Sequence, residues 1–221
     1  MATGDLNGDG LVDLLLGTAT NASLFLGTGP GAFNSTAAHT FTGGAVAAAI
    51  ADLDNDGRRD VVLIRAGTSS AFRTTAATAS TASFGTAVSL TTPLATSVAV
   101  GDVNGDGLAD VVVGAQGVGA QTRVFANLGS TAGTWNGYAA TAGTLLGADT
   151  ATKAVALADL NNDGVLDLLA VTTAVAHSCM SMRVSARPGG TASRPVSRWP
   201  TPPTLAPWPP ATSTPTASPT C

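Results

Sequence analysis

The 221-residue chain contains no glutamate and only one lysine, Lys153, so the usual surface mixture of acidic and basic side chains is missing. All fourteen acidic residues are aspartates, and thirteen of them fall in four short windows, with only Asp149 elsewhere. A solvating acidic surface would mix both acids and spread them along the chain. The carboxylates are therefore concentrated in four local sites. Outside these sites the chain has almost no side chains that could act as a general acid or base.

Cysteine is confined to Cys179 and Cys221, so the body of the chain has neither a disulfide framework nor a thiolate metal site. No apolar run approaches the roughly 18–20 residues that span a bilayer, and we expect no membrane span. The first residues also lack the basic and apolar regions of a signal peptide. Up to Ala174 the chain has fourteen aspartates against six basic residues, a net charge of −8, which argues against nucleic acid as a partner.

Other routes to catalysis are poorly represented. His39 and His177 stand far apart in the sequence, and neither a G-x-S-x-G nor a G-x-x-x-x-G-K-[ST] motif occurs. The stretch at residues 27–32 superficially resembles a phosphate loop, but its proline and the aromatic that follows favour a hairpin turn. Trp135 and Tyr138 are either a platform for sugar or peptide or, as we favour, core residues beside a turn. We predict that the chain is not an enzyme.

What the sequence does contain is a nine-residue pattern, D-x-[DN]-x-D-G-x-x-D, repeated four times. The copies begin at Asp5, Asp52, Asp102 and Asp159, with spacings of 47, 50 and 57 residues. Short apolar or alternating stretches precede the last three copies, and a short apolar run follows every copy, as expected for strands. The spacing predicts units of about four short strands, in the order strand, loop, strand, strand, glycine-rich turn, strand. We expect the first loop to lack its preceding strand, so that the chain begins inside a repeat.

The loop pattern predicts calcium sites. Side chains at positions 1, 3 and 5 converge only if the backbone curls around one point, and glycine at position 6 permits that turn. Position 7 can then offer its backbone carbonyl, and the carboxylate at position 9 closes the cage. Hard oxygen ligands on a loop suit calcium better than zinc or copper. The predicted ligands of up to four ions are Asp5, Asn7, Asp9, Leu11 and Asp13; Asp52, Asp54, Asp56, Arg58 and Asp60; Asp102, Asn104, Asp106, Leu108 and Asp110; and Asp159, Asn161, Asp163, Val165 and Asp167.

An EF-hand loop and an ordinary turn are two other interpretations of the loop pattern. An EF-hand loop begins in the same way but needs a glutamate at position 12 and flanking helices. Position 12 is Leu16, Leu63, Val113 or Ala170, and the flanks are strand-like. A single copy would fit an ordinary turn equally well, because aspartate, asparagine and glycine all favour turns. Four copies in register favour metal, and four dications would balance the charge of −8.

The sequence DVNGDGLADVVVG, preceded by SVAV, together with LFLGTGPGAF in the first repeat, resembles the FG-GAP/VCBS repeat family. Members of that family form β-propellers, as in integrin α-subunits. The resemblance covers roughly residues 1–174 and implies an all-β fold with blades of four antiparallel strands and calcium in the motif-bearing blades. Because such propellers usually have about seven blades, we expect an incomplete, open propeller of three to four blades.

Residues 175–221 differ in character, with ten of the twelve prolines and no acidic residue. Such a segment cannot bury enough apolar surface to offset its chain entropy, so we expect a disordered Pro/Thr/Ser-rich tail. A linker and a reading-frame artefact both explain the change.

The predicted function is a non-catalytic, calcium-binding module that serves as an adhesion or ligand-binding scaffold, with an unknown protein or carbohydrate as partner. Calcium loops of extracellular modules bind at roughly 10⁻⁴–10⁻³ M, which favours the cell surface or the extracellular space. Family members also occur as modules of secreted enzymes, so an accessory propeller domain of a larger hydrolase or lyase is the alternative. A truncated product without function is a third interpretation. Open blade edges predict self-association.

Overall fold

The computed structural model describes residues 1–65, 67–117, 120–139, 143–144, 151–160 and 162–172. Every regular element in these ranges is a β-strand, and every strand pairing is antiparallel, which confirms the predicted all-β class. No helix in this part of the chain is long and apolar enough to cross a membrane. The predicted tail at 175–221 lies outside the described residues, as do Asp149, Asn161 and His177.

The first sheet has the strand order β1-β2-β3-β6. Its strands are β1 (Ala2–Gly4), β2 (Asp13–Gly17), β3 (Asn21–Phe25) and β6 (His39–Thr42), with a separate hairpin, β4 (Gly27–Gly29) and β5 (Ala32–Phe33), between β3 and β6. The prediction that the first loop lacks a preceding strand is therefore wrong. The strand β1 has no apolar pattern to reveal it, because it is held by backbone pairing with β2 rather than by buried side chains.

The second and third sheets repeat this arrangement. The second consists of β7 (Ala47–Ala51), β8 (Asp60–Ile64), β9 (Ser69–Phe72) and β12 (Val88–Leu90), with the hairpin β10 (Thr74–Thr78) and β11 (Thr81–Phe84). The third consists of β13 (Ala95–Gly101), β14 (Asp110–Ala115), β15 (Arg123–Phe125) and β18 (Gly143–Thr144), with the hairpin β16 (Ser130–Thr131) and β17 (Thr134–Trp135). The fourth sheet is described as two strands, β19 (Thr152–Ala158) and β20 (Asp167–Thr172).

An additional hairpin thus separates the third and fourth strands of each complete sheet. The glycine-rich turns were predicted to join those two strands directly, and that part of the predicted order is wrong. In the first repeat the turn at Gly31 belongs to the β4–β5 hairpin, and the fourth strand begins only at His39. The hairpin reading of residues 27–32 is confirmed. A local turn signal cannot show which of two successive hairpins it closes.

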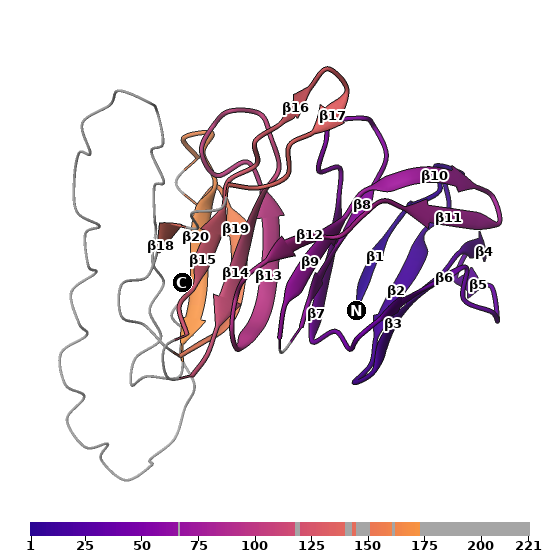
Figure 1. Ribbon diagram of the computed structural model, residues 1–221, viewed down its shortest axis with the longest axis horizontal. Coiled ribbons are helices and arrows are strands. Elements are labelled where there is room, and N and C mark those ends of the chain that lie inside the picture. The colour runs from indigo at the N-terminus through magenta and orange to yellow at the C-terminus, as the bar shows by residue number, and fades with distance from the viewer. Residues whose placement is uncertain (66, 118–119, 140–142, 145–150, 161, 173–221) are drawn as a thin grey trace, which may run out of the picture.

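The four sheets lie side by side in a row, with the first and the last at opposite ends (Figure 1). The first strands of successive sheets contact one another, from β1 to β7, β13 and β19. These strands are rich in small residues, which allows close approach: a Cβ added to Gly4 would lie 2.9 Å from Ile50 Cγ2. The described sheets do not close into a ring, so the arrangement is an open, propeller-like one with three complete blades.

The hydrophobic core lies between the sheets. On β8, Val61 and Leu63 pack toward the first sheet, whereas Val62 and Ile64 pack toward the third. A strand that is buried on both faces has a continuous run of apolar residues instead of an alternating pattern. This explains the short apolar run that follows each loop. The first sheet has no neighbour on its outer side among the described residues, and there the Leu16 side chain is 40% exposed.

The difference between an inner and an end sheet can be tested by truncating one leucine on each. We expect Leu63→Ala to lower the free energy of unfolding by about 2–5 kcal/mol, because the cavity it leaves is closed on both sides. Leu16→Ala removes a partly exposed side chain and should cost less than about 1 kcal/mol. Urea unfolding of the full chain, followed by circular dichroism, measures both. Equal losses would show that the two sheets are packed alike.

Candidate metal centre

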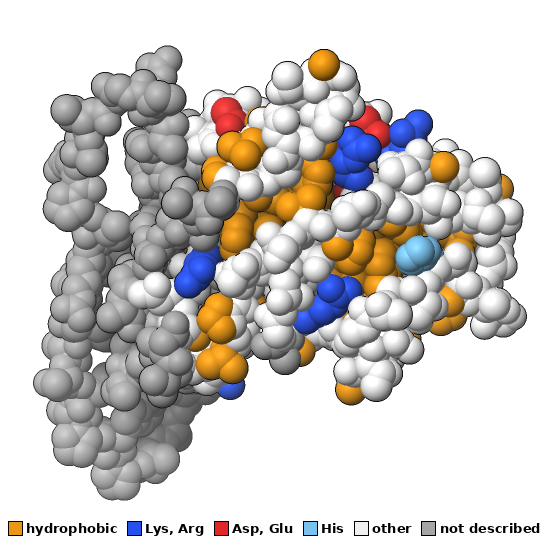
Figure 2. Space-filling model, viewed as in Figure 1, with side chains coloured by type: hydrophobic (Ala, Val, Ile, Leu, Met, Phe, Trp, Pro, Cys, Tyr) orange, Lys and Arg blue, Asp and Glu red, His pale blue; other side chains and the backbone are white. Residues whose placement is uncertain are grey.

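Each of the four predicted loops connects the first and second strands of its sheet, so the structure places them at equivalent positions. The acidic side chains that are visible in Figure 2 lie along the upper edge of the molecule. Repetition of one connection in neighbouring sheets is therefore what brings the aspartates of distant sequence segments to one edge.

Two positions in each loop have a left-handed backbone. Glycine at position 6 was expected to do so, and this is confirmed for Gly10, Gly57, Gly107 and Gly164, with φ of 83°, 85°, 83° and 82°. Position 4 was missed; it is occupied by Gly8, Asn55, Gly105 and Asn162, with φ of 76°, 58°, 80° and 58°. The signal was present in the sequence, since only glycine and asparagine occur there and both tolerate this conformation.

The aspartate at position 1 curls the loop around its own carboxylate. In the third loop Asp102 accepts the N–H groups of Gly105 at 2.7 Å, Asp106 at 3.2 Å and Gly107 at 2.7 Å. Asp5 accepts the three equivalent N–H groups in the first loop. The curled backbone conformation that a metal site would need is therefore already formed by hydrogen bonds within the loop.

The side chains at positions 3 and 5 hold each other. Asn104 accepts the N–H of Asp106 at 2.8 Å and donates from Nδ2 to the Asp106 carboxylate at 2.9 Å. Asp106 in turn accepts the N–H of Leu108 at 2.9 Å. Asn7, Asp9 and Leu11 repeat all three contacts in the first loop. Participation of the position-7 carbonyls in metal binding stays a prediction.

The aspartate at position 9 is buried in all four loops, namely Asp13, Asp60, Asp110 and Asp167. In the third loop one oxygen of Asp110 accepts the N–H of Val103 at 3.1 Å, and the other accepts the N–H of Asn127 at 2.8 Å. Val103 belongs to the loop, whereas Asn127 follows the third strand. Asp13 and Asp60 make the corresponding pairs of bonds. We call these four buried carboxylates the latch aspartates, because in the first three sheets each joins its loop to the segment that follows the neighbouring third strand.

Burial makes three of these carboxylates, Asp13, Asp60 and Asp110, harder to ionise. It raises the pKa of Asp60 to about 6, although the N–H groups of Thr74 and Leu53 oppose the shift. Burial likewise raises the pKa of Asp13 and of Asp110, with neighbouring aspartates of the loop adding to the effect. Because a carboxylate oxygen has two lone pairs, an oxygen that accepts one N–H can still face a cation, which would offset this cost.

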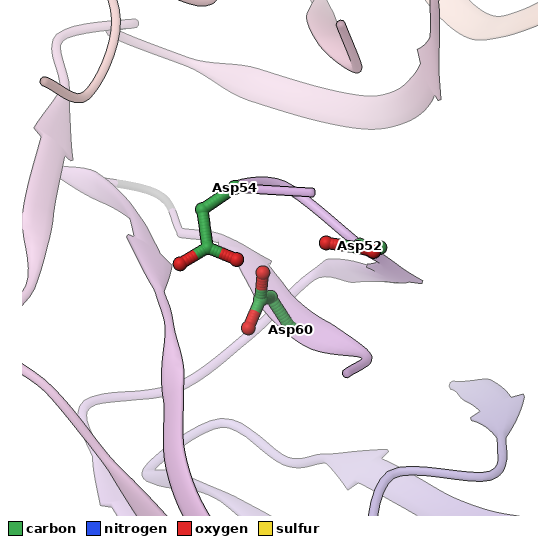
Figure 3. A group of neighbouring side chains, drawn as sticks. All are labelled: Asp52, Asp54 and Asp60. Atoms are coloured by element: carbon green, nitrogen blue, oxygen red, sulfur yellow. The ribbon is translucent and has the colours of Figure 1, made fainter. Parts of the chain in front are cut away.

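The second loop brings three carboxylates together. One oxygen each of Asp52, Asp54 and Asp60 lies within 4.8 Å of the others, and Figure 3 shows the three side chains converging. Asp52 Oδ2 accepts the N–H of Gly57 at 2.9 Å, but its Oδ1 is buried and accepts no hydrogen bond from any described residue. A buried carboxylate oxygen without a donor is the environment a cation would satisfy. These all-oxygen donors fit calcium.

The second loop is also distinguished by its own counter-ion. It has Asp54 at position 3, where the other loops have asparagine, and Arg73 NH1 lies 2.8 Å from Asp54 Oδ2. The Asp54 side chain is only 4% exposed, so little water screens this pair. Burial raises the pKa of Asp54, and Arg73 counteracts that shift. The equivalent positions before the latch contact are Leu26 and Ala126, so no arginine occupies them.

Asn127, which sequence reasoning missed, links the second and third loops. Its Nδ2 donates to the carbonyl of Leu53 at 2.6 Å and to that of Ala109 at 3.0 Å, while its own N–H reaches Asp110. Its Oδ1 accepts Trp135 Nε1 at 3.0 Å. One buried asparagine therefore connects two neighbouring loops with the hairpin beside them.

The aromatic residues of this region are structural, as we favoured. Tyr138 is buried within the core between the second and third sheets, and Trp135 packs against that core. The two rings meet edge to face at 5.3 Å, a favourable aromatic geometry.

The sequence profile of the FG-GAP-like repeat family matches residues 5–63, 52–113 and 102–170. The chain belongs to this family. Each FG-GAP match begins at the first aspartate of one loop and ends within the strand after the next loop, so it spans the contact between two sheets. No curated protein matches the chain. FG-GAP repeats are typical of extracellular proteins, and here they form a propeller-type scaffold.

The latch can be separated from metal binding by working in chelator. Asp110→Asn places an NH₂ group against a backbone N–H and leaves a buried donor unpaired, so we expect a loss of about 1–3 kcal/mol without calcium. Asp106→Asn changes an exposed residue of the same loop and should cost less than about 1 kcal/mol. Chemical unfolding in chelator measures both. A small, equal effect of the two changes would contradict the latch.

Proposed function

We propose that the chain is a non-catalytic, calcium-stabilised FG-GAP scaffold that binds a protein or carbohydrate outside the cytoplasm. The observation that supports calcium most directly is the second loop, where Asp52, Asp54 and Asp60 converge and a buried oxygen of Asp52 has no donor among the described residues. The other loops share its backbone conformation, with left-handed residues at positions 4 and 6.

The ligands of each ion would be the side chains at positions 1, 3, 5 and 9 and the backbone carbonyl at position 7. A bound dication supplies positive charge that neutralises repelling carboxylates and joins segments of the chain. The latch aspartates would extend that effect, because in the first three sheets each already accepts an N–H from a residue after the third strand, such as Thr74 or Asn127. Calcium would then order the inserted hairpin that follows this residue, as well as the loop itself.

A non-catalytic role is supported by the placement of the titratable groups. Every described aspartate lies in one of the four loops, and most are bonded to loop backbone. His39 lies instead among aromatic rings, with centroid distances of 4.5 Å to Phe41 and 4.8 Å to Phe84. Among the described residues, His39 and the aspartates are therefore not paired within hydrogen-bond reach, as general acid–base catalysis would require.

Ligand binding would fall to the inserted hairpins and connecting loops. The hairpins β4–β5, β10–β11 and β16–β17 occupy the same place in each sheet but differ in length and sequence. Variable segments on a repeated rigid framework are where scaffolds of this kind carry their specificity. A calcium-ordered edge of this kind suits adhesion to a protein or a carbohydrate.

Calorimetric titration of the full chain with calcium, with thermal melts in calcium and in chelator, tests this function. We expect uptake of up to four ions at submillimolar to millimolar concentrations and a higher melting temperature in calcium, as loops of extracellular modules show. Magnesium, which prefers a stricter octahedral geometry, should be a poor substitute and serves as the control. Absence of both heat and stabilisation would refute the calcium role.

Arg73 should weaken the second site specifically. A unit charge about 6 Å from a dication in water repels it by roughly 1.4 kcal/mol, so we expect Arg73→Gln to strengthen calcium binding there by about tenfold. The Gly57 amide signal in a nuclear magnetic resonance titration reports on this loop, and the Gly107 signal reports on its neighbour. Arg123→Gln, at the other end of the strands, is the matched control and should change neither affinity. An unchanged calcium affinity at the Gly57 signal would mean that Arg73 does not repel the bound ion.

A further inference from the structure

A pocket of about 330 Å³ lies between the first and second sheets. The first sheet contributes all four residues of β6, and the second contributes Arg65, Phe72 and Ala87. Figure 2 shows the histidine of this region, in pale blue, set among hydrophobic side chains. The pocket is therefore formed by the contact between two blades, away from the latch aspartates.

One wall of the pocket is aromatic. Phe41 lies 4.8 Å from both Phe72 and Phe84 between ring centroids, and His39 contacts Phe41 and Phe84. Phe41 is buried, whereas the other three rings are partly exposed. Burial lowers the pKa of His39, which favours the neutral imidazole. The lining residues His39, Phe41 and Phe72 thus form an uncharged wall of tilted rings, against which another ring can pack.

The other wall carries Arg65, a cation that forms no ion pair with the described residues. The Arg65 guanidinium lies 5.6 Å over the Phe72 ring, and NH1 donates to Ser70 Oγ at 3.0 Å. Its Nε is buried and donates to no atom of the described residues. The ion pairs among the described residues lie outside the pocket. They join Arg58 to Asp56 and Arg73 to Asp54.

The topology explains why no loop aspartate reaches Arg65. Asp60 begins β8 beside the second loop, and Arg65 follows the opposite end of the same strand. A half-buried guanidinium with a free N–H and no carboxylate is costly unless something pairs with it. Its planar fork matches the geometry of a carboxylate.

We propose that this pocket binds a small carboxylate whose ring or apolar body rests on the aromatic wall. The carboxylate accepts hydrogen bonds from Arg65, and the body contacts His39 and Phe72. A singly charged, planar anion is favoured over a phosphate because the lining offers one cation. Aromatic acids and acidic sugars share this chemistry.

This site is independent of the calcium loops, because none of its residues belongs to one. Failure of calcium binding and failure of carboxylate binding are therefore separate results. Four probes separate the possible sources of the ligand: benzoate and glucuronate carry the charge, while benzamide and glucose are their uncharged counterparts.

The test is a magnetic resonance titration of the full chain at low ionic strength, following the signals of His39 and Phe72. We expect at least one acid to bind at millimolar concentration and its neutral counterpart to bind at least tenfold more weakly. Arg65→Gln should lose at least tenfold in affinity, and Arg65→Lys should recover only part of it, because lysine lacks the fork. Arg123→Gln is the control, since this partly exposed arginine donates to the Thr91 carbonyl outside the pocket.

Binding of benzoate assigns the pocket to aromatic acids, and binding of glucuronate assigns it to acidic sugars; either supports the proposal. If Arg65→Gln does not fold, the comparison of each acid with its neutral counterpart on the unaltered chain still decides. Equal binding of charged and neutral probes, no binding of either acid, or full affinity in a folded Arg65→Gln variant would overturn it and leave Arg65 a structural residue.

Discussion

The buried carboxylate at the ninth position of each loop is the constraint on which the rest of each blade depends. In the first three sheets it accepts one N–H from its own loop and one from the residue after the third strand, as Asp110 does from Val103 and Asn127. A carboxylate can make such bonds only while it stays in place under the core, at the start of the second strand. The loop, the third strand and the inserted hairpin are thereby held in a fixed relation. Any ion bound to the loop would act on all three.

Internal repetition supplies comparisons that a single site would not. The first and third loops have asparagine at position 3 and bond it to the aspartate at position 5. The second loop has Asp54 instead, together with the arginine that pairs with it. The extra carboxylate of Asp54 and its counter-ion Arg73 therefore occur together. A carboxylate that is only 4% exposed is costly to bury without a positive partner. The four sites therefore differ in charge while sharing one backbone.

Much of the fold was predictable because it is local. The loops, the strands on both sides of them and the left-handed glycine such as Gly57 follow from short patterns in the sequence. The order of hairpins was not predictable, since a turn signal such as that at Gly31 does not say which strands it joins. The strand β1 was missed because none of its three residues is fully buried, so no apolar pattern marks it in the sequence. Asn127 was missed because its partners are 18 and 74 residues away, and no local pattern encodes such bonds.

Hydrogen exchange at the N–H groups that bond to the latch aspartates tests the calcium-stabilised latch most directly. The informative amides are those of Gly27, Thr74 and Asn127, measured in the full chain with calcium and with chelator. If calcium acts through the buried carboxylates, these amides gain protection together with the loop amides, although they lie outside the loops. Calcium-dependent protection confined to the loops, or no change at either place, would contradict that link.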